Sequence, residues 1–329
     1  MGTLTEALCV EGSPQAVHRP VLQEELLEYL GPRREGELMV DATQGEGGHS
    51  FAFLSCFPDL RIIGIDADPE IQKIARERLK GFGSRVEFVS GWSQDFFSEY
   101  VSDERPDTIL IDLGISLFHY ERSGRGFSFR RDEKLDMRIH PGTVESAADL
   151  IARLPEKDLA DLLYVNAEER YSRRIAREIV RVREQGAITS SKMLAEIVER
   201  VLPPAYRRGA VHGATKTFLA LRIAVNGELS RLPELLRAAL KTLKKGGRMG
   251  VISFHSLEDR IVKNFFRGMN RDCVCPPEAP ICRCEGKRIV NFLAKKGISP
   301  GEEEIRINPP SRSARLRIVE KVNDEVESC

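Results

Sequence analysis

Short apolar runs alternate with amphipathic segments through the first third of the chain. Runs of consecutive apolar residues that are bounded by glycine, proline or acidic residues are typical of buried strands. The predicted strands are residues 38–42, 61–66, 86–89 and 108–112. Segments with the helical spacing of apolar residues, 22–30 and 71–79, precede and separate these runs. This alternation predicts an α/β protein with a doubly wound sheet.

The alternation stops after the fourth predicted strand. From residue 117 to residue 228 the pattern is helical, and no segment has the composition of a strand. The predicted helices are residues 147–154, 157–164, 167–184, 191–201 and 214–229. The strand pattern returns at 248–254, after a helix at 232–243, and once more at 314–320. The sequence therefore predicts a helical segment inserted into the sheet.

We expect two domains with different charge. A discontinuous core comprises residues 1–116 and 230–329, and a helical domain, residues 117–229, is inserted into it. The formal net charge is zero, but residues 1–116 carry 10 Lys and Arg against 21 Asp and Glu, so the rest of the chain is basic. A basic surface that faces a polyanion is one interpretation, and an ordinary mixed surface is the other.

A glycine-rich turn follows the first predicted strand. It runs from Asp41 through Gly45, Gly47 and Gly48 to His49, and the second strand ends at Asp66. Strand, glycine loop, helix, strand and acid is the order of a βαβ unit that holds a nucleotide-like cofactor. Asp66 lies 21 residues after Gly45, where a carboxylate accepts hydrogen bonds from ribose hydroxyls.

The acid before the glycine loop favours one cofactor over another. Asp41 would repel the pyrophosphate of a dinucleotide, but it suits the amino group of S-adenosylmethionine. The glycine spacing also departs from the G-x-G-x-x-G pattern that a nicotinamide oxidoreductase, the rival enzyme class, would need. Trp92 follows the third strand, where its ring can stack on adenine or pack in the core. Asp112 ends the fourth strand, at the edge where ligands of such sheets bind.

Composition and length exclude several classes of protein. The 329 residues are 41% hydrophobic, which is enough for a core, and no apolar run approaches the roughly 18 residues of a membrane span. The N-terminal stretch lacks a basic region followed by an apolar one, so it does not have the form of a signal peptide. We expect a cytoplasmic protein that does not bind membranes.

Four of the seven cysteines cluster near the C-terminal end, as Cys273-Val-Cys275 and Cys282-Arg-Cys284. An odd number of cysteines in a chain without a secretory signal argues against a disulfide scaffold. Four thiols could hold zinc, although these pairs are tighter than the usual C-x₂-C spacing. We expect a reduced cysteine-rich loop without metal, and a zinc site is the alternative.

Long motifs over nearly the whole chain resemble those of one family, the bacterial 16S ribosomal RNA cytosine-N4 methyltransferases called MraW or RsmH. The motifs are Asp41-Ala-Thr-x-Gly-x-Gly-Gly-His-Ser50, Leu110-Ile-Asp-Leu-Gly-Ile-Ser116, Arg125-Gly-Phe-Ser-Phe129, Leu135-Asp-Met-Arg138, Glu168-Glu-Arg170, Ala214-Thr-Lys-Thr-Phe218, Leu221-Arg-Ile-Ala-Val-Asn226 and the stretch from Val251 to Lys263. The resemblance implies a class I, Rossmann-like methyltransferase core with an inserted helical domain for substrate recognition. It also implies S-adenosylmethionine as the methyl donor.

The same resemblance implies a substrate and a set of cofactor contacts. The substrate is the N4 amine of cytosine 1402 in 16S ribosomal RNA, near the decoding centre, either naked or in the small subunit; no DNA partner is expected. The implied cofactor contacts are Gly47, Gly48, His49, Asp66, Trp92, Asp112 and His119. Trp92 replaces the usual phenylalanine, and His119 stands where glutamine is usual. The altered segment around His119 keeps open a rival hypothesis, an RNA-binding protein without turnover.

Catalytic and RNA-binding candidates complete the predicted site. Methyl transfer from a sulfonium needs positioning and exclusion of water more than a strong base. Asp112 is expected to orient the donor or the N4 amine; His255 is the second candidate, with helix capping as its alternative role. The candidate RNA contacts are Arg125, Phe127, Arg138, Arg222 and Asn226. Guanidinium and aromatic groups can stack on a flipped base, although Phe127 equally suits the core.

Overall fold

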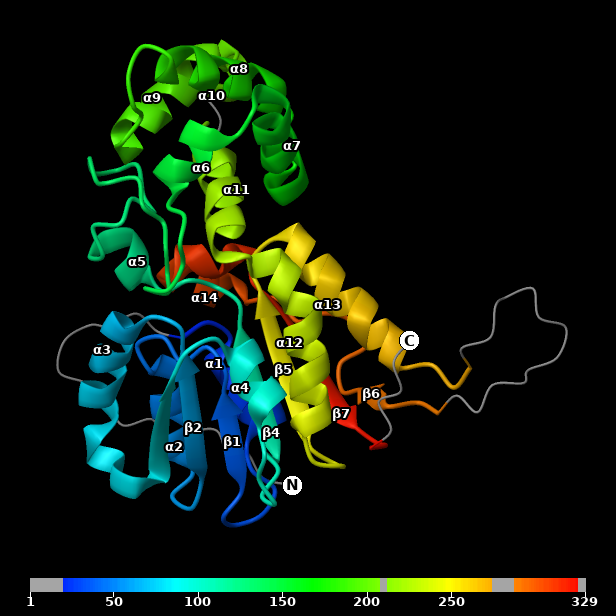
Figure 1. Ribbon diagram of the computed structural model, residues 1–329. Coiled ribbons are helices and arrows are strands. Elements are labelled where there is room, and N and C mark those ends of the chain that lie inside the picture. The colour runs from blue at the N-terminus through cyan, green and yellow to red at the C-terminus, as the bar shows by residue number, and fades with distance from the viewer. Residues whose placement is uncertain (1–19, 208–211, 274–286, 325–329) are drawn as a thin grey trace, which may run out of the picture. The chain divides into compact units, whose positions relative to one another are not determined.

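The computed structural model describes residues 20–207, 212–273 and 287–324 (Figure 1). Its contacts divide the chain into two compact units. The core unit comprises the described residues up to Gly114 and those from Leu232 onward, and the helical unit is Ile115–Arg231. No helix in these described ranges is both long enough and apolar enough to cross a membrane.

A seven-stranded sheet forms the centre of the core unit, in the order β3-β2-β1-β4-β5-β7-β6. The strands are β1 (Leu38–Asp41), β2 (Arg61–Asp66), β3 (Val86–Ser90), β4 (Thr108–Asp112), β5 (Arg248–Ser253), β6 (Val290–Phe292) and β7 (Arg315–Lys321). β1 to β5 are parallel, and β7 runs antiparallel to both of its neighbours. The order reverses between β1 and β4, so the carboxyl ends of these two strands form the point where ligands of open sheets bind.

Helices cover both faces of this sheet (Figure 1). The core unit contains α1 (Gln23–Leu30), α2 (Gly48–Cys56), α3 (Pro69–Leu79), η1 (Lys80–Arg85), α4 (Ser93–Glu99), α13 (Ser256–Met269), α14 (Glu302–Ile307), η2 (Pro309–Ser313) and most of α12 (Glu228–Thr242). The helices α1, α2 and α3 pack on the face that carries Leu110, and α4, α12 and α13 pack on the face that carries Ile109 and Ile111. Successive strand residues point to opposite faces, which is why the apolar run Ile109-Leu110-Ile111 of β4 contributes to both layers.

The helical unit contains short helices joined by loops. They are α5 (Leu117–Glu121), α6 (Ala147–Arg153), α7 (Glu156–Ala167), α8 (Ser172–Arg183), α9 (Ser191–Val201), α10 (Pro204–Arg207) and α11 (Thr215–Asn226). α7 packs against both α8 and α11. A capping box of Ser146 and Asp149 begins α6, because each residue satisfies a backbone N–H of the other. Among the described residues of this unit there is no strand, only an isolated bridge between Lys134 and Ser190.

The structure confirms the predicted doubly wound sheet and corrects several boundaries. The helix predicted at 167–184 is interrupted, because Glu168 takes a left-handed conformation (φ 49°) that ends α7, and α8 begins at Ser172. The helix predicted at 214–229 ends at Asn226, because Gly227 (φ 63°) forms a left-handed C-cap. Neither α4 nor the three-residue β6 was predicted; both are too short to give a clear hydrophobic period.

Candidate cofactor and active site

The loop between β1 and α2 depends on backbone conformations that glycine adopts most readily. Gly45 (φ 55°) and Gly47 (φ 76°) are both left-handed. A Cβ atom on Gly47 would lie 3.0 Å from Cδ1 of Leu79, so a side chain there would also crowd α3. Gly47 is the N-cap of α2, and it has no side chain that could accept a hydrogen bond from the first N–H groups of the helix. This arrangement suits a helix start that faces a ligand.

Asp66 ties the end of β2 to this loop. Its Oδ2 accepts a hydrogen bond from the Gly45 N–H at 2.8 Å, and its Oδ1 accepts one from the Asp68 N–H at 2.8 Å. Asp68 in turn caps α3 by accepting the Glu70 N–H. Asp66 therefore joins the end of β2 to both the glycine loop and the start of α3.

Asp41 lies beneath the glycine loop and not on its surface. The residue is 1% exposed, and its Oδ2 accepts a hydrogen bond from the Ser50 hydroxyl at 2.6 Å. Burial raises the pKa of Asp41 above its usual range, and the negative charge of Asp112 adds to this shift. The Ser50 hydrogen bond and His49 lower that pKa and oppose the effect of burial.

Asp112 is the more accessible carboxylate of the site. Its side chain is 21% exposed at the carboxyl end of β4. Its backbone N–H donates to Thr43 Oγ1 at 2.7 Å, and its Oδ1 accepts the Gly114 N–H at 3.4 Å. The His49 Nε2 atom lies 3.6 Å from Asp112 Oδ2. An acid, an imidazole and a second acid therefore meet at the ends of β1 and β4.

Several buried polar atoms of this cluster make no hydrogen bond within the described part of the chain. They include Gln44 Oε1 and both ring nitrogens of His49. Buried polar atoms in native proteins normally have a partner. Their position beside a glycine loop and two carboxylates fits a ligand that carries an amino acid and a ribose, such as S-adenosylmethionine.

The structure brings together most of the predicted cofactor residues. Asp41, Gly45, Gly47, Gly48, His49, Asp66 and Asp112 lie at the carboxyl ends of β1, β2 and β4 or in the loop and helix that follow β1. Trp92 follows β3 in the same unit and is the N-cap of α4. His119 is a buried residue of α5 in the helical unit, where its ring meets Phe127 edge-on at 5.3 Å.

His255 begins α13 as its N-cap. Its Nδ1 accepts the Glu258 N–H at 3.5 Å, and Glu258 Oε2 accepts the N–H groups of Phe254 and His255 at 2.8 and 3.3 Å. His255 Nε2 also lies 3.1 Å from Glu258 Oε1. These contacts are those of a capping box, so the structure supports the helix-capping role for this histidine.

Two of the candidate RNA-binding arginines are engaged within the helical unit. The Arg125 guanidinium donates to the carbonyl oxygens of Arg138 and Ile139 at 2.9 and 3.1 Å. Arg138 forms a bidentate pair with Asp136, at 2.7 and 2.8 Å. Both side chains therefore shape the loop that carries them.

The remaining candidates surround the same loop. Asn226 accepts the Ile139 N–H and donates to the Met137 carbonyl oxygen, both at 2.9 Å. Arg222 is buried, pairs with Glu228 at 2.7 Å and donates to the Tyr120 hydroxyl. Phe127 is buried as well. The sequence analysis did not predict that these residues form hydrogen bonds within the helical unit. The one signal was that Arg222 and Asn226 lie among apolar residues in the sequence of α11.

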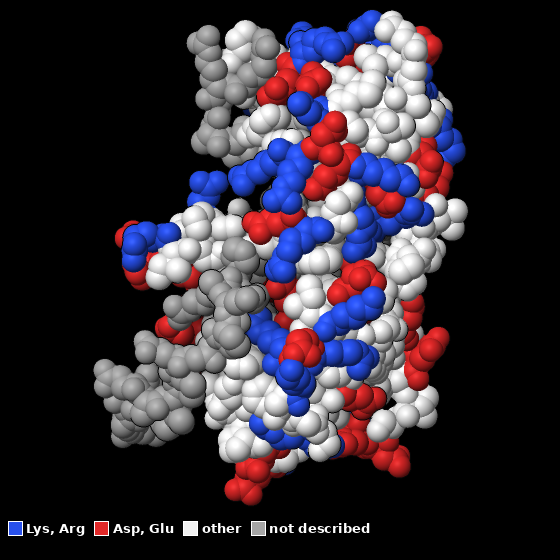
Figure 2. Space-filling model, turned by 90° about the vertical axis from the view of Figure 1, so that its left-hand side faces the viewer, with Lys and Arg blue, Asp and Glu red and all other residues white. Residues whose placement is uncertain are grey.

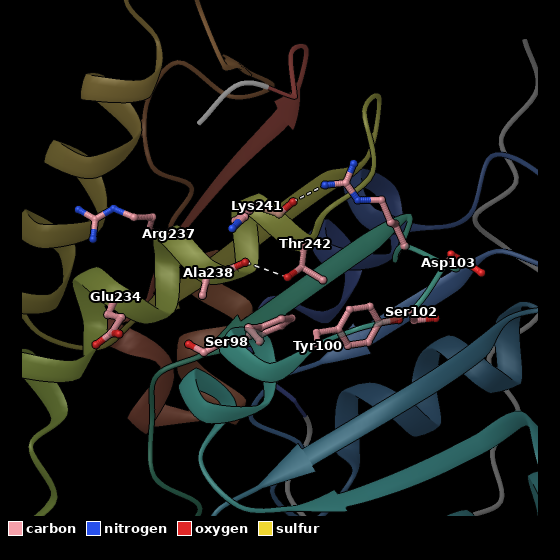
Figure 3. A pocket seen from close by; sticks show the side chains of 11 residues that line it. Ser98, Tyr100, Ser102, Asp103, Glu234, Arg237, Ala238, Lys241 and Thr242 are labelled. Carbon is pink, nitrogen blue, oxygen red and sulfur yellow. Dashed lines mark hydrogen bonds between the residues drawn. The ribbon is translucent and has the colours of Figure 1, made fainter. Parts of the chain in front are cut away.

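A cavity of about 630 Å³ lies elsewhere in the core unit, between α4 and α12 (Figure 3). Its lining mixes basic and acidic side chains, among them Arg105, Arg237, Lys241, Asp103 and Glu234. Arg105 donates to the Lys241 carbonyl oxygen (Figure 3), and the Tyr100 hydroxyl donates to the Glu104 carbonyl oxygen at 2.6 Å. The lining contains none of the predicted site residues, so this cavity is separate from the site at the ends of β1 and β4.

The cysteine cluster is described only in part. Cys273 is exposed, whereas Cys275, Cys282 and Cys284 lie outside the described residues. In the part of the chain that the structure describes, no three His, Cys, Asp or Glu residues are placed to hold a metal ion. The predicted cysteine loop stays a prediction.

The sheet order, the antiparallel β7, the glycine loop after β1 and the acids that end β2 and β4 define a class I methyltransferase. The sequence profile of the MraW methylase family matches residues 15–322. A ribosomal RNA small subunit methyltransferase H from Treponema denticola is 54% identical over 310 residues, which cover 94% of this chain and 98% of the relative. Its namesake from Syntrophobacter fumaroxidans is 45% identical over 95% of this chain and 98% of the relative. The chain belongs to the MraW methylase family.

Solved structures with a similar course of the chain are more distant. A putative rRNA methylase from Clostridium thermocellum has a TM-score of 0.41 at 12% identity and covers 91% of this chain and 95% of its own. A putative methyltransferase from Streptococcus mutans in complex with SAH has a TM-score of 0.39 at 14% identity, with coverage of 91% and 95%. These scores are low, and the family assignment rests on the sequence matches.

Proposed function

We propose that this chain transfers a methyl group from S-adenosylmethionine to the N4 amine of cytosine 1402 in 16S ribosomal RNA. The observation that carries this proposal is the 54% identity, over 94% of the chain, to a ribosomal RNA small subunit methyltransferase H. The acid–imidazole–acid cluster beside the glycine loop supports the proposal. We place the enzyme in the cytoplasm, where small ribosomal subunits are assembled.

The residues proposed to hold the cofactor have distinct tasks. The cofactor supplies an electrophilic methyl group on a sulfonium. The glycine loop allows a close approach of the backbone to its methionine part, Asp66 accepts hydrogen bonds from its ribose, and Trp92 stacks on its adenine. Asp41 is proposed to support the glycine loop and not to contact the cofactor, because its carboxylate is buried and accepts a hydrogen bond from Ser50.

Asp112 is the group proposed to meet the target amine. It is the partly exposed carboxylate at the end of β4, and contacts with Thr43 and Gly114 fix its backbone and one of its oxygens. A carboxylate in this place can accept a hydrogen bond from cytosine N4 and so aim the nitrogen lone pair. The N4 lone pair is partly delocalised into the ring, so holding the amine matters more than basicity.

The helical unit is proposed to recognise the RNA. Arg173 and Arg174 are exposed on α8, while Arg181 is paired with Glu178 at 2.6 Å. Basic and acidic side chains are interspersed across the face seen in Figure 2. In this proposal the loop around Met137 is held in shape by Arg125, Arg138, Arg222 and Asn226. The exposed arginines make the contacts with RNA phosphates. Binding should therefore weaken steeply with salt.

A transfer assay with labelled S-adenosylmethionine tests the function and the substrate form together. The acceptors are small subunits that lack the modification, 16S RNA stripped of protein, and large subunits as a matched control. Label in the small subunits or the 16S RNA, and none in the large subunits, is the expected result. Donor binding in calorimetry without transfer to any acceptor would instead favour an RNA-binding role without turnover.

A further inference from the structure

The cavity of about 630 Å³ between α4 and α12 has walls that are bonded to each other (Figure 3). The Gln94 amide of α4 donates to Glu234 Oε2 of α12 at 2.6 Å. Arg105, in the segment that follows α4, donates to the Lys241 carbonyl oxygen of α12 and also pairs with Asp324 at 3.0 Å. Both walls belong to the core unit, so the cavity is a feature of one compact part of the chain.

Two cationic side chains of α12 line this cavity without a partner. Arg237 and Lys241 are four residues apart, so they lie on the same side of the helix, one turn from each other. Both are exposed, and neither side chain forms an ion pair or a hydrogen bond in the part of the chain that the structure describes. Glu234, the acid three residues before Arg237, accepts a hydrogen bond from Gln94 instead. The two cations are therefore available to bind an anionic ligand.

The rest of the lining suits a ligand that carries hydrogen-bond donors as well as negative charge. Ser98 and Ser102 contribute hydroxyl groups. Asp103 contributes an exposed carboxylate, and Tyr100 contributes an aromatic ring. A simple anion has no donor for a carboxylate. A ribonucleotide has a phosphate for the cations, a 2′-hydroxyl that can donate to a carboxylate, and a base that can stack on a tyrosine ring.

We propose that the cavity between α4 and α12 binds a single-stranded segment of the substrate RNA, with Arg237 and Lys241 on its phosphates. This inference rests on the proposed function, which makes RNA the partner of the chain. It adds a contact on the core unit to the contacts proposed for the exposed arginines of α8. Each phosphate that a protein cation neutralises releases counterions, so the salt dependence of binding measures the number of such contacts.

The test measures how the full chain binds 16S RNA stripped of protein, with and without Arg237→Gln and Lys241→Gln combined. We expect affinity at low salt to fall about tenfold. The slope of log affinity against log salt should decrease by about 1.4–1.8, since each phosphate contact contributes about 0.7–0.9. Affinity for S-adenosylmethionine in calorimetry should stay within about twofold, because none of the proposed cofactor residues lines the cavity. The matched control combines Lys73→Gln and Lys80→Gln, two exposed lysines that are paired with glutamates, and should bind RNA as wild type.

Crosslinking gives a second readout that does not depend on activity. 16S RNA that contains 4-thiouridine is irradiated with the wild-type protein, and the crosslinked peptides are identified by mass spectrometry. We expect crosslinks within residues 94–105 or 232–245, and their loss in the double variant. The inference is overturned if these segments carry no crosslink, or if the double variant keeps the affinity and salt slope of the lysine control. A wild-type protein that crosslinks there but transfers no methyl group would instead refute the proposed function.

Discussion

At the scale of single residues, the two carboxylates of the site, Asp41 and Asp112, differ in how far they are buried. Asp41 and Asp112 end neighbouring parallel strands. Asp41 is buried and accepts a hydrogen bond from Ser50, whereas Asp112 is partly exposed. Sequence alone placed both acids at the same edge, because the carboxyl ends of parallel strands meet there. The sequence did not indicate which of the two acids is more deeply buried, because the burial of Asp41 depends on how the glycine loop packs against the end of β1. The two similar acids therefore have different surroundings: Asp41 is buried beneath the glycine loop, and Asp112 is accessible from the site.

The buried Asp41 should make the stability of the protein depend on pH. Burial raises its pKa in the folded state above the unfolded value of about 4, so the native protein binds this proton more tightly. The free energy of unfolding then falls as the pH rises from the unfolded toward the folded pKa. Asp41→Asn keeps an acceptor for Ser50 and removes this titration. Urea unfolding at several pH values should show a flatter dependence in the variant, and an unchanged dependence would contradict the assignment.

Asp66 should matter for the cofactor more than for the fold. Asp66→Ala removes the acceptor of the Gly45 N–H and the proposed ribose contact. We expect affinity for S-adenosylmethionine to fall at least about tenfold, which is about 1.4 kcal/mol. Isothermal calorimetry measures this directly, with Asp59→Ala, an exposed position in the turn before β2, as the control. Equal affinities of the two variants would remove Asp66 from the site.

At the scale of elements, the glycine loop and the helix starts determine where the site residues point. The glycine pattern was readable from sequence because a left-handed turn and a close backbone approach leave few other residues possible. The second role of Gly47, contact with Leu79 of α3, was not readable because it depends on how α3 packs. The same limit applies to Glu168, whose left-handed conformation interrupts a segment with an unbroken helical pattern.

Gly47→Ala tests the strain in this loop. A residue with a Cβ pays about 1–2 kcal/mol for a left-handed conformation, and the new atom would press on Leu79 at 3.0 Å. We expect a loss of stability of at least that size in urea unfolding, together with weaker cofactor binding. Gly81→Ala, where nothing lies within 4 Å of the new atom, should be close to neutral. Similar losses at both positions would contradict the strain argument.

His255 gives a prediction about a helix start. Since it caps α13, His255→Ala should destabilise the protein by about 0.5–2 kcal/mol, and His255→Asn, a good N-cap, should recover most of that loss. Methyl transfer by the asparagine variant should remain close to wild type if capping is the whole role. A well-folded asparagine variant with a rate reduced more than about tenfold would restore His255 as a catalytic candidate.

At the scale of the whole molecule, sequence predicted the sheet and the residues on its ligand edge more completely than it predicted the helical unit. The strands carry long apolar runs, and the acids and glycines lie at their ends. RNA contact by Arg125, Arg222 and Asn226 stays a prediction. The sequence did not indicate the intramolecular partners of these residues, because those partners are distant in sequence or belong to the backbone. Single-sequence patterns contain no information on such pairings. RNA contact by the helical unit therefore remains a proposal.

The central claim is methylation of one cytosine by a chemistry that depends on Asp112. The most direct measurement is mass spectrometry of nuclease fragments of 16S RNA, taken from modification-free small subunits incubated with S-adenosylmethionine and either wild-type or Asp112→Asn protein. We predict N4-methylcytidine at position 1402 with the wild-type protein, and at least about a hundredfold slower formation with a variant that still binds the cofactor. Methylation at another nucleotide, or an undiminished rate with Asp112→Asn, would contradict the account.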